Sequence, residues 1–220
     1  MSTDDSPWLR IPAADYEGHM AAAGPTAALR RLFSSVYSRI QPRRVAVLGC
    51  TTGADFDAID PGVTDVAAGV DINARYLDIA ENRLAALGRR VHLVCGDVLK
   101  VELPEAPFDL VHAALLLEYV DPAALFRRVQ RWLAPAGRFS VIIQERLPGI
   151  AAVTSTRYES LQLLAGTMSL RSTNEVTSVG LREGFVRKSS EALELPGGKV
   201  LVQMLFEPLT ALQSERAPRE

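Results

Sequence analysis

The chain has 220 residues, of which 48% are hydrophobic and 23% are charged, and its formal net charge at pH 7 is −2. This length and composition indicate one globular domain with one substantial core. The near-neutral charge and the dispersed Lys and Arg residues do not favour nucleic acid as a partner. No stretch is long and apolar enough to span a bilayer, so we expect no membrane partner either.

The start of the chain is acidic and lacks the apolar segment of a signal peptide, so we expect a cytoplasmic location. The two cysteines, Cys50 and Cys95, form no paired framework and are interpreted as reduced thiols, in agreement with that location. His19, His92 and His112 are far apart in the sequence, so we expect no metal site.

The N-terminal segment, residues 1–24, opens with a polar, proline-bearing stretch, and we expect residues 1–15 to be mobile. Residues 15–20 carry distinctive side chains without helical periodicity, and this segment is a candidate lid. Residues 25–40 place their apolar side chains on one helical face and predict a helix packed across a sheet.

The middle of the chain alternates predicted strands and helices. Strands are predicted at residues 45–48, 66–70, 91–95, 108–114 and 139–143. Helices are predicted at residues 54–59, 74–87 and 122–133, the second capped by Asn73 and the third by Asp121. This alternation is typical of a doubly wound α/β sheet.

Beyond the fifth strand the pattern changes. One helical segment is predicted around residues 158–168, and a second is opened by the capping-box spacing of Ser172 and Glu175. Two strands, residues 185–195 and 199–206, are joined by a connection so short that they must be antiparallel neighbours. We therefore expect one reversed strand at the edge of the sheet. The main domain is predicted to cover residues 25–207, followed by a polar tail at 208–220.

Three features follow predicted strands, at the edge where such sheets bind their ligands. The turn from Gly49 to Gly53 offers free backbone N–H groups and close access to the main chain. Asp71 ends the second strand, where a carboxylate can accept hydrogen bonds from two ribose hydroxyls. Asp97 follows the third strand and can accept from an adenine amine. The alternative roles are helix capping for Asp71 and a plain turn for Gly96 and Asp97.

At this point the sequence resembles the class I S-adenosylmethionine-dependent methyltransferases, over about residues 25–207. The matching motifs are at residues 45–53, 69–73, 95–98, 108–111 and 133–139. The resemblance implies a seven-stranded, mostly parallel sheet with a C-terminal antiparallel hairpin. It also implies S-adenosylmethionine as the cofactor, with the turn holding the methionine part, Asp71 the ribose and Asp97 the adenine. The cofactor-binding residues expected on this basis are Gly49, Cys50, Thr51, Gly53, Asp71, Ile72, Asp97, Val98 and Ala113.

Two residues depart from the family pattern. Members commonly have an acidic residue where Val47 stands and a glycine where Thr51 stands. A catalytically silent binding module with the same fold is therefore an alternative to an enzyme. Thr51 also argues against a nicotinamide-dependent oxidoreductase, whose fingerprint requires glycine at that position.

Methyl transfer requires that the acceptor be placed beside the methyl group in a dry site and, where needed, deprotonated. We expect the acceptor pocket over the ends of the fourth and fifth strands, under the N-terminal segment. Candidate acceptor-binding residues are Tyr16, Tyr119, Glu145 and Tyr158.

His19 and Glu118 are the candidate catalytic residues, although a lone loop histidine is more often a packing or surface residue and Glu118 could open a helix. His112 lies within an apolar strand and is interpreted as structural. The motifs of nucleic-acid methyltransferases are missing, so a small molecule is the expected acceptor; the sequence predicts neither its identity nor the oligomeric state.

Overall fold

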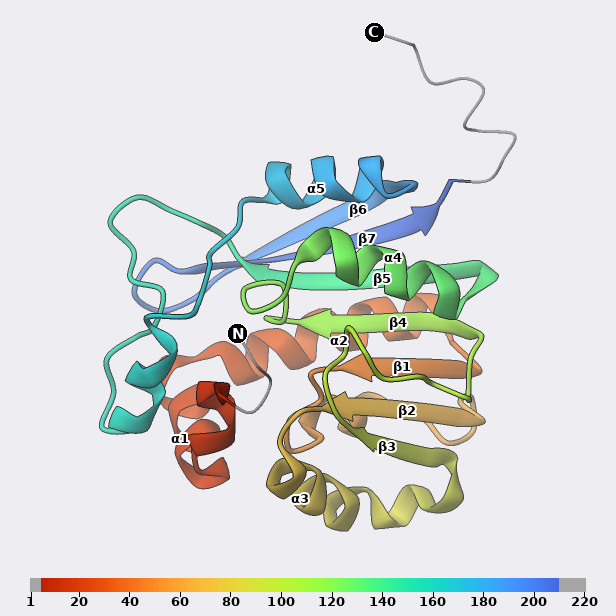
Figure 1. Ribbon diagram of the computed structural model, residues 1–220, viewed down its shortest axis with the longest axis horizontal. Helices are drawn as coiled ribbons and strands as arrows, with labels where there is room; N and C mark the ends of the chain where they lie inside the picture. The colour runs from red at the N-terminus through yellow and green to blue at the C-terminus, as the bar shows by residue number, and fades with distance from the viewer. Residues whose placement is uncertain (1–4, 210–220) are drawn as a thin grey trace, which may run out of the picture.

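The computed structural model describes residues 5–209, with the Arg89 side chain left out. Its centre is a seven-stranded sheet with strand order β3-β2-β1-β4-β5-β7-β6 (Figure 1). The strands are β1 (Arg44–Leu48), β2 (Val66–Asp71), β3 (Val91–Cys95), β4 (Phe108–Ala114), β5 (Leu133–Gln144), β6 (Phe185–Glu194) and β7 (Val200–Pro208). The strands β1 to β5 pair in parallel, whereas β7 is antiparallel to both β5 and β6.

Helices connect the strands and precede the sheet. The α-helices are α1 (Ala13–Ala23), α2 (Pro25–Ile40), α3 (Ala74–Leu84), α4 (Pro122–Trp132) and α5 (Thr173–Arg182). The 3₁₀ helices are η2 (Pro7–Arg10), η3 (Ala54–Ala58), η4 (Ala85–Arg90) and η5 (Glu159–Leu164). The predicted caps are present: Asn73 accepts from the Arg75 N–H, Asp121 accepts from the Ala124 N–H, and Ser172 and Glu175 form a capping box.

The core consists of two layers, one on each face of the sheet. Along β1, Val45 and Val47 pack into a cluster with residues of α2 and α3, whereas Ala46 and Leu48 pack into a cluster with residues of α4 and α5. This alternation follows from the period of two in a strand and explains why the whole segment is apolar. The fold is therefore the doubly wound α/β architecture that the sequence predicts.

The reversed strand is not at the sheet edge, in contrast to the expectation from the sequence. Strand β7 lies between β5 and β6, and β6 forms the edge. Burial gives the physical reason, because residues 201–206 of β7 are all buried, whereas only Phe185 of β6 is buried. The more continuously apolar strand of the hairpin occupies the inner position.

His112 on β4 is a core residue, as the sequence predicts. Its Nδ1 lies 3.0 Å from Ser140 Oγ, and its ring centroid lies 4.5 Å from that of Phe33. Gln203 donates from Nε2 to Ser140 Oγ and to the Leu32 carbonyl, so these polar side chains join β4, β5, β7 and α2. Burial lowers the pKa of His112 to about 3, so the ring is neutral at pH 7.

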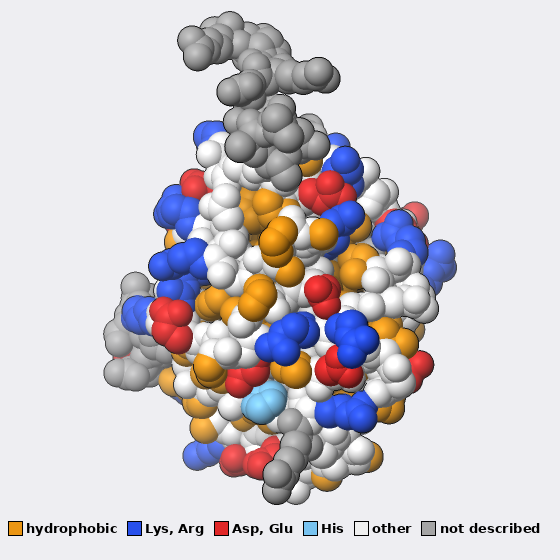
Figure 2. Space-filling view, turned by 90° about the vertical axis from the view of Figure 1, so that its right-hand side faces the viewer, with side chains coloured by type: hydrophobic (Ala, Val, Ile, Leu, Met, Phe, Trp, Pro, Cys, Tyr) orange, Lys and Arg blue, Asp and Glu red, His pale blue; other side chains and the backbone are white. Residues whose placement is uncertain are grey.

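The face at the amino ends of the parallel strands carries charges of both signs side by side (Figure 2). Arg43 pairs with Asp65 at the start of β2, and Arg138 pairs with Glu207 where β5 meets β7. No helix among residues 5–209 is long and apolar enough to cross a membrane.

Gly69 in β2 gives a stability prediction. A Cβ at this position would lie 2.8 Å from Leu93 Cδ2 and 3.0 Å from both Cys50 Sγ and Phe56 Cζ. We expect Gly69→Ala to lower the free energy of unfolding by about 1–3 kcal/mol, because these groups are packed in the core. Urea unfolding measures the change. The control is Gly166→Ala, where a Cβ meets no atom within 4 Å; equal stability of the two variants would contradict the prediction.

Candidate functional site

The turn after β1 has a left-handed backbone at three positions: Gly49 (φ 69°), Thr51 (φ 47°) and Gly53 (φ 84°). The N–H groups of Gly49 and Cys50 both donate to the Val70 carbonyl, which fixes the turn against the end of β2. A Cβ on Gly53 would lie 3.1 Å from Ala80 Cβ and 3.3 Å from Ala80 Cα, so glycine here allows the turn to approach α3 closely.

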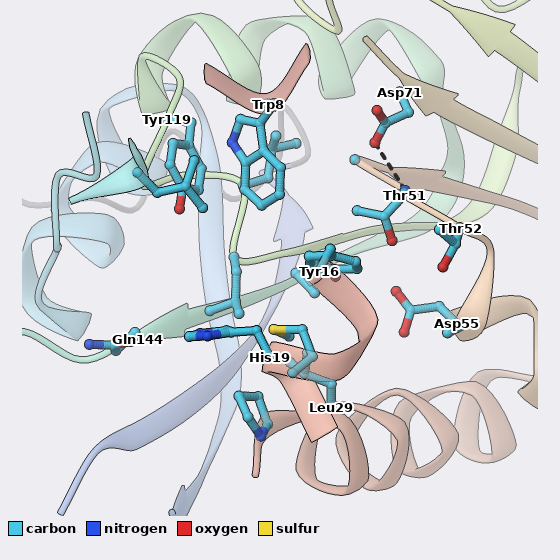
Figure 3. A pocket seen from close by; sticks show the side chains of 18 of the residues that line it. Trp8, Tyr16, His19, Leu29, Thr51, Thr52, Asp55, Asp71, Tyr119 and Gln144 are labelled. Carbon is cyan, nitrogen blue, oxygen red and sulfur yellow. Dashed lines mark hydrogen bonds between the residues drawn. The ribbon is translucent and has the colours of Figure 1, made fainter. Parts of the chain in front are cut away.

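Asp71 lies beside this turn and is 8% exposed. Its Oδ2 accepts from the Thr51 N–H at 2.9 Å, drawn as a dashed line in Figure 3, and its Oδ1 accepts from the Asn73 N–H at 2.8 Å. Burial raises the pKa of Asp71, and the N–H donors of Asn73, Thr51 and Ile72 act in the opposite direction. The capping of α3 is done by the Asn73 side chain, so Asp71 is not the cap of that helix.

A cavity of about 700 Å³ opens beside Asp71 at the carboxyl ends of the strands. Its first half, next to β1, β2 and β3, is lined by Gly49, Thr51, Asp55, Asp71, Ile72, Asp97 and Val98. Its second half, next to β5 and β7, is lined by His19, Leu29, Gln144, Leu195, Lys199 and Leu201. In Figure 3, Thr51, Asp55 and Asp71 lie on one side of Tyr16, and Gln144 lies on the other. The volume is in the range of pockets that hold small molecules and cofactors.

Asp97 borders the first half of the cavity, where the sequence places an adenine-binding carboxylate. Its Oδ1 accepts from the Leu99 N–H at 2.9 Å, and its Oδ2 lies 3.2 Å from the Lys100 ammonium. The neighbouring Val98 is 5% exposed and adds an apolar wall.

Three of the nine expected cofactor-binding residues do not line the cavity. Cys50 and Ala113 are 2% and 0% exposed and belong to the hydrophobic clusters on the two faces of the sheet. Gly53 is buried against α3, as described above. These residues support the turn and β4 from behind the cavity wall.

Glu118, a candidate catalytic residue, also lies outside the cavity lining. Its side chain is 1% exposed, and its Oε1 accepts from the Gln144 N–H at 2.8 Å. Burial raises the pKa of Glu118 to about 7, while the Gln144 N–H and the charge of Arg171 act in the opposite direction. The carboxyl group therefore joins the loop after β4 to the end of β5.

Two of the four candidate acceptor-binding residues line the cavity and two do not. Tyr16 and Tyr119 line the cavity, whereas Glu145 and Tyr158 do not. Glu145 Oε2 accepts from both the N–H and the hydroxyl of Thr173, so this carboxylate stabilises the start of α5. Tyr158 packs against α1, since a Cβ on Gly18 would lie 2.2 Å from its Cζ.

Residues 7–10 and 13–23 are helical, in contrast to the expectation of a loop at residues 15–20. Of the stretch expected to be mobile, residues 1–4 lie outside the described residues. Trp8 is a cavity residue that the sequence did not indicate. Its ring centroid lies 5.8 Å from that of Tyr16 and 5.2 Å from that of Tyr119, and its carbonyl accepts from Asn73 Nδ2. The three rings therefore form an aromatic cover over the cavity (Figure 3).

Helix α1 is joined to the turn by Glu17, a further residue that the sequence analysis did not select. Its Oε1 accepts from Thr52 Oγ1 at 2.6 Å and from Arg83 of α3 at 2.7 Å. These hydrogen bonds and the ion pair with Arg83 lower the pKa of Glu17. The cover, the turn and α3 thus form one connected unit.

His19 lies on α1 and lines the second half of the cavity, with 7% of its surface exposed. Its Nδ1 lies 2.9 Å from Thr156 Oγ1, and its Nε2 has no hydrogen-bond partner among residues 5–209. Burial lowers the pKa of His19, and the positive charge of Lys199 lowers it further. The ring is therefore neutral at pH 7 and can accept a proton.

Comparison with known proteins agrees with this geometry. A family profile described as a methyltransferase domain matches residues 45–137, from β1 into β5. Over these residues the chain is similar to methyltransferase domains. The comparisons confirm the expected fold class, and the match over residues 45–137 agrees with the expected family and cofactor.

Among curated proteins, the chain is 30% identical over 108 residues to phosphoethanolamine N-methyltransferase 3 of Arabidopsis thaliana. The match covers 48% of this chain and 22% of that protein, so the chain spans about a fifth of the length of this relative.

Two solved methyltransferase structures share the fold. The 1,6-didemethyltoxoflavin-N1-methyltransferase of Burkholderia thailandensis, solved with S-adenosylhomocysteine, gives a TM-score of 0.67 at 18% identity, covering 90% of this chain and 84% of that one. Geranyl diphosphate C-methyltransferase of Streptomyces coelicolor, also solved with S-adenosylhomocysteine, gives 0.64 at 14% identity, covering 80% and 76%.

The two departures from the methyltransferase pattern have clear structural positions. Val47 is 1% exposed and lies in the same cluster as Phe33, so an apolar residue fits this environment. Thr51 adopts a left-handed backbone, which explains why the family commonly has glycine there. Its N–H still reaches Asp71, so the threonine preserves the hydrogen bond that orients the carboxylate.

Proposed function

We propose that this chain transfers a methyl group from S-adenosylmethionine to a small-molecule acceptor. The observation that supports this most strongly is the single cavity that joins Asp71 and the glycine turn to His19. A ligand in the first half and an acceptor in the second would then share one water-poor space. Proximity of this kind is the main requirement of the reaction.

The residues of the first half fit the cofactor. The Thr51 N–H donates to one Asp71 oxygen and the Asn73 N–H to the other, and the remaining lone pairs of the carboxylate can accept from ribose hydroxyls. Asp97 can accept from the adenine amine, and Ile72 and Val98 can hold the ring. Gly49 leaves room for the methionine part. S-adenosylmethionine, when bound, supplies a methyl group on a positively charged sulfur.

Asp55 fits the amino group of the cofactor and replaces the acid that is missing at Val47. It lines the first half of the cavity beside the turn, and its carboxylate has no hydrogen-bond or ion-pair partner among residues 5–209. Burial raises the pKa of Asp55 to about 6, and the charge of Asp57 also raises it, while Arg30 lowers it. The group is mostly ionised at pH 7, and a bound ammonium group would favour its charged form further.

The residues of the second half fit an acceptor that must lose a proton. In the tautomer whose Nδ1–H donates to Thr156 Oγ1, the His19 ring has its free lone pair on Nε2. Nε2 is then available as general base for an acceptor hydroxyl or amine. The cover of Trp8, Tyr16 and Tyr119 excludes water from the same space.

A small acceptor is supported by the size and lining of the cavity. The names of the similar proteins also refer to small compounds, namely phosphoethanolamine, 1,6-didemethyltoxoflavin and geranyl diphosphate. The mixed charges of the face in Figure 2 and the net charge of −2 do not favour nucleic acid.

A methyl-transfer screen tests this function. The chain is incubated with methyl-labelled S-adenosylmethionine and a panel of small amines, phenols, thiols and organic acids, and labelled product is measured with S-adenosylhomocysteine formation. We expect at least one compound to be methylated, with one molecule of S-adenosylhomocysteine formed for each molecule of labelled product. Tight cofactor binding without transfer to any compound would instead favour the silent binding module, which Val47 and Thr51 support.

The N-terminal cover gives a second prediction. We propose that residues 7–23 act as a lid whose opening admits the ligands, since this segment lies outside the sheet and lines the cavity with Trp8, Tyr16 and His19. Amide hydrogen exchange in this segment is expected to slow at least about tenfold when S-adenosylhomocysteine is added, while exchange in α2 changes little. Equal protection with and without ligand would mean that the segment is permanent packing.

A further inference from the structure

The charged side chains that line the cavity are unevenly distributed. Six acids line it: Glu17, Asp55, Asp57, Asp71, Asp97 and Asp121. They come from α1, η3, the last residue of β2 and the segments that follow β3 and β4. Three cations line it, of which Arg30 pairs with Asp57 at 3.0 Å and Arg83 pairs with Glu17 at 2.7 Å. The third cation, Lys199, has no carboxylate within 4.0 Å among residues 5–209.

Lys199 is held in place by neutral groups. It lies at the end of the β6–β7 connection, and its ammonium donates to the Ala152 carbonyl at 2.8 Å and to Gln144 Oε1 at 3.2 Å. Gln144 is 5% exposed, and its own amide donates to the Ala151 carbonyl, which fixes the orientation of the side chain. An ammonium group has three N–H donors, so one remains for a ligand in the cavity.

Leucine side chains make up much of the wall around Lys199. Leu29, Leu115, Leu195 and Leu201 line the same half of the cavity. Lys199 is half-buried, and burial lowers its pKa. A cation in such an environment loses solvation that two neutral carbonyl groups replace only in part, and a bound anion would compensate for the rest.

We propose that Lys199 is the anion-binding residue of the acceptor half and that the methyl acceptor is a small organic acid with an apolar skeleton. This inference rests on the proposed function and specifies its substrate class. One free N–H and one positive charge match a carboxylate, whereas a phosphate group would require more donors than this half of the cavity offers. Lys199 then orients the acceptor by its carboxylate while His19 faces the atom that loses its proton.

Matched pairs of small acids and their neutral amides test this proposal. The probes are benzoate and benzamide, phenylacetate and phenylacetamide, and hexanoate and hexanamide, each titrated at constant ionic strength into protein loaded with S-adenosylhomocysteine. Protein NMR shifts give the dissociation constants. We expect the acids to bind about tenfold more tightly than the amides, on the scale of one charge-assisted hydrogen bond. This preference is expected to be lost in Lys199→Gln and retained in Lys199→Arg.

The matched control is Lys188→Gln, which removes an exposed lysine of β6 that pairs with Glu207 of β7 and does not line the cavity. This variant should keep the full preference. Equal binding of acids and amides, no binding of any acid, or a preference that persists in Lys199→Gln would overturn the proposal. S-adenosylhomocysteine is titrated into every variant first. Failure of that titration would contradict the proposed function, whereas an intact titration without acid preference would contradict only the role of Lys199.

Discussion

Asp71→Asn is expected to weaken the binding of S-adenosylhomocysteine by about ten- to a hundredfold. The exchange removes the negative charge and turns one acceptor oxygen into a donor, while the size of the side chain is kept. Loss of a hydrogen bond to a charged group costs about 1.5–3 kcal/mol, which corresponds to this range. The new amide would also face the Thr51 or Asn73 N–H, so part of the loss would come from a disturbed turn. Isothermal titration calorimetry measures the affinity.

The control for this variant is Asp57→Asn. Asp57 lines the same cavity, but it is exposed and pairs with Arg30. We expect its affinity to change less than about threefold, because exposed ion pairs contribute little. Circular dichroism shows whether both variants keep the fold. If the two variants bind equally well, Asp71 does not hold the ribose.

His19→Gln is expected to lower kcat by a factor of about a hundred or more with an acceptor that must be deprotonated. This is the usual contribution of a positioned general base. Glutamine retains a polar group near Thr156 but cannot accept a proton at neutral pH. Binding of S-adenosylhomocysteine should stay within about twofold, because His19 lines the other half of the cavity. The methyl-transfer assay measures kcat of the variant and of the unmodified chain from the label transferred to the acceptor.

The pH profile gives an independent test of the same residue. Burial and the charge of Lys199 lower the pKa of His19 below its ordinary value of 6.5. Since the neutral ring is the active form, the rate should be constant above pH 7 and fall only as the pH decreases through that lowered value. His19→Gln should lose this acid limb. The control is His92→Gln, which changes an exposed ring beside Glu105 and should keep the acid limb. A normal rate in His19→Gln would show that His19 is not the general base.

The sheet and the cofactor half of the site could be predicted because each depends on local sequence signals. Buried strands are continuous apolar runs, and the residues that follow them reach one edge of the sheet whatever the helices between them do. This is why Gly49, Asp71 and Asp97 meet in the cavity although 48 residues separate the first from the last.

The cover could not be predicted because α1 has no single apolar face. Its side chains make contacts in several directions: Asp15 accepts from Ser160, Glu17 from Thr52 and Arg83, and His19 contacts Thr156. A helix surrounded in this way has no stripe of period 3.6. Trp8 belongs to a short proline-bearing segment whose partners, Tyr16 and Tyr119, are determined only by the tertiary structure.

The acceptor half was predicted less well for a related reason. Glu118 and Glu145 follow strands β4 and β5, but each carboxylate is used in a structural contact, with the Gln144 N–H and with Thr173. A sequence position near a strand end does not determine on which side of the chain a side chain lies. Lys199 was not selected because its role depends on the missing carboxylate partner, which only the assembled cavity reveals.

A calorimetric titration of the unmodified chain tests the central claim most directly. S-adenosylmethionine and S-adenosylhomocysteine are each titrated into the protein, with NAD as the control ligand for the other nucleotide class of this architecture. We predict that both adenosyl compounds bind at one site per chain with micromolar or tighter affinity and that NAD gives no binding heat at the same concentrations. Binding of NAD alone, or of none of the three ligands, would contradict the assignment of the Asp71 turn as a cofactor site.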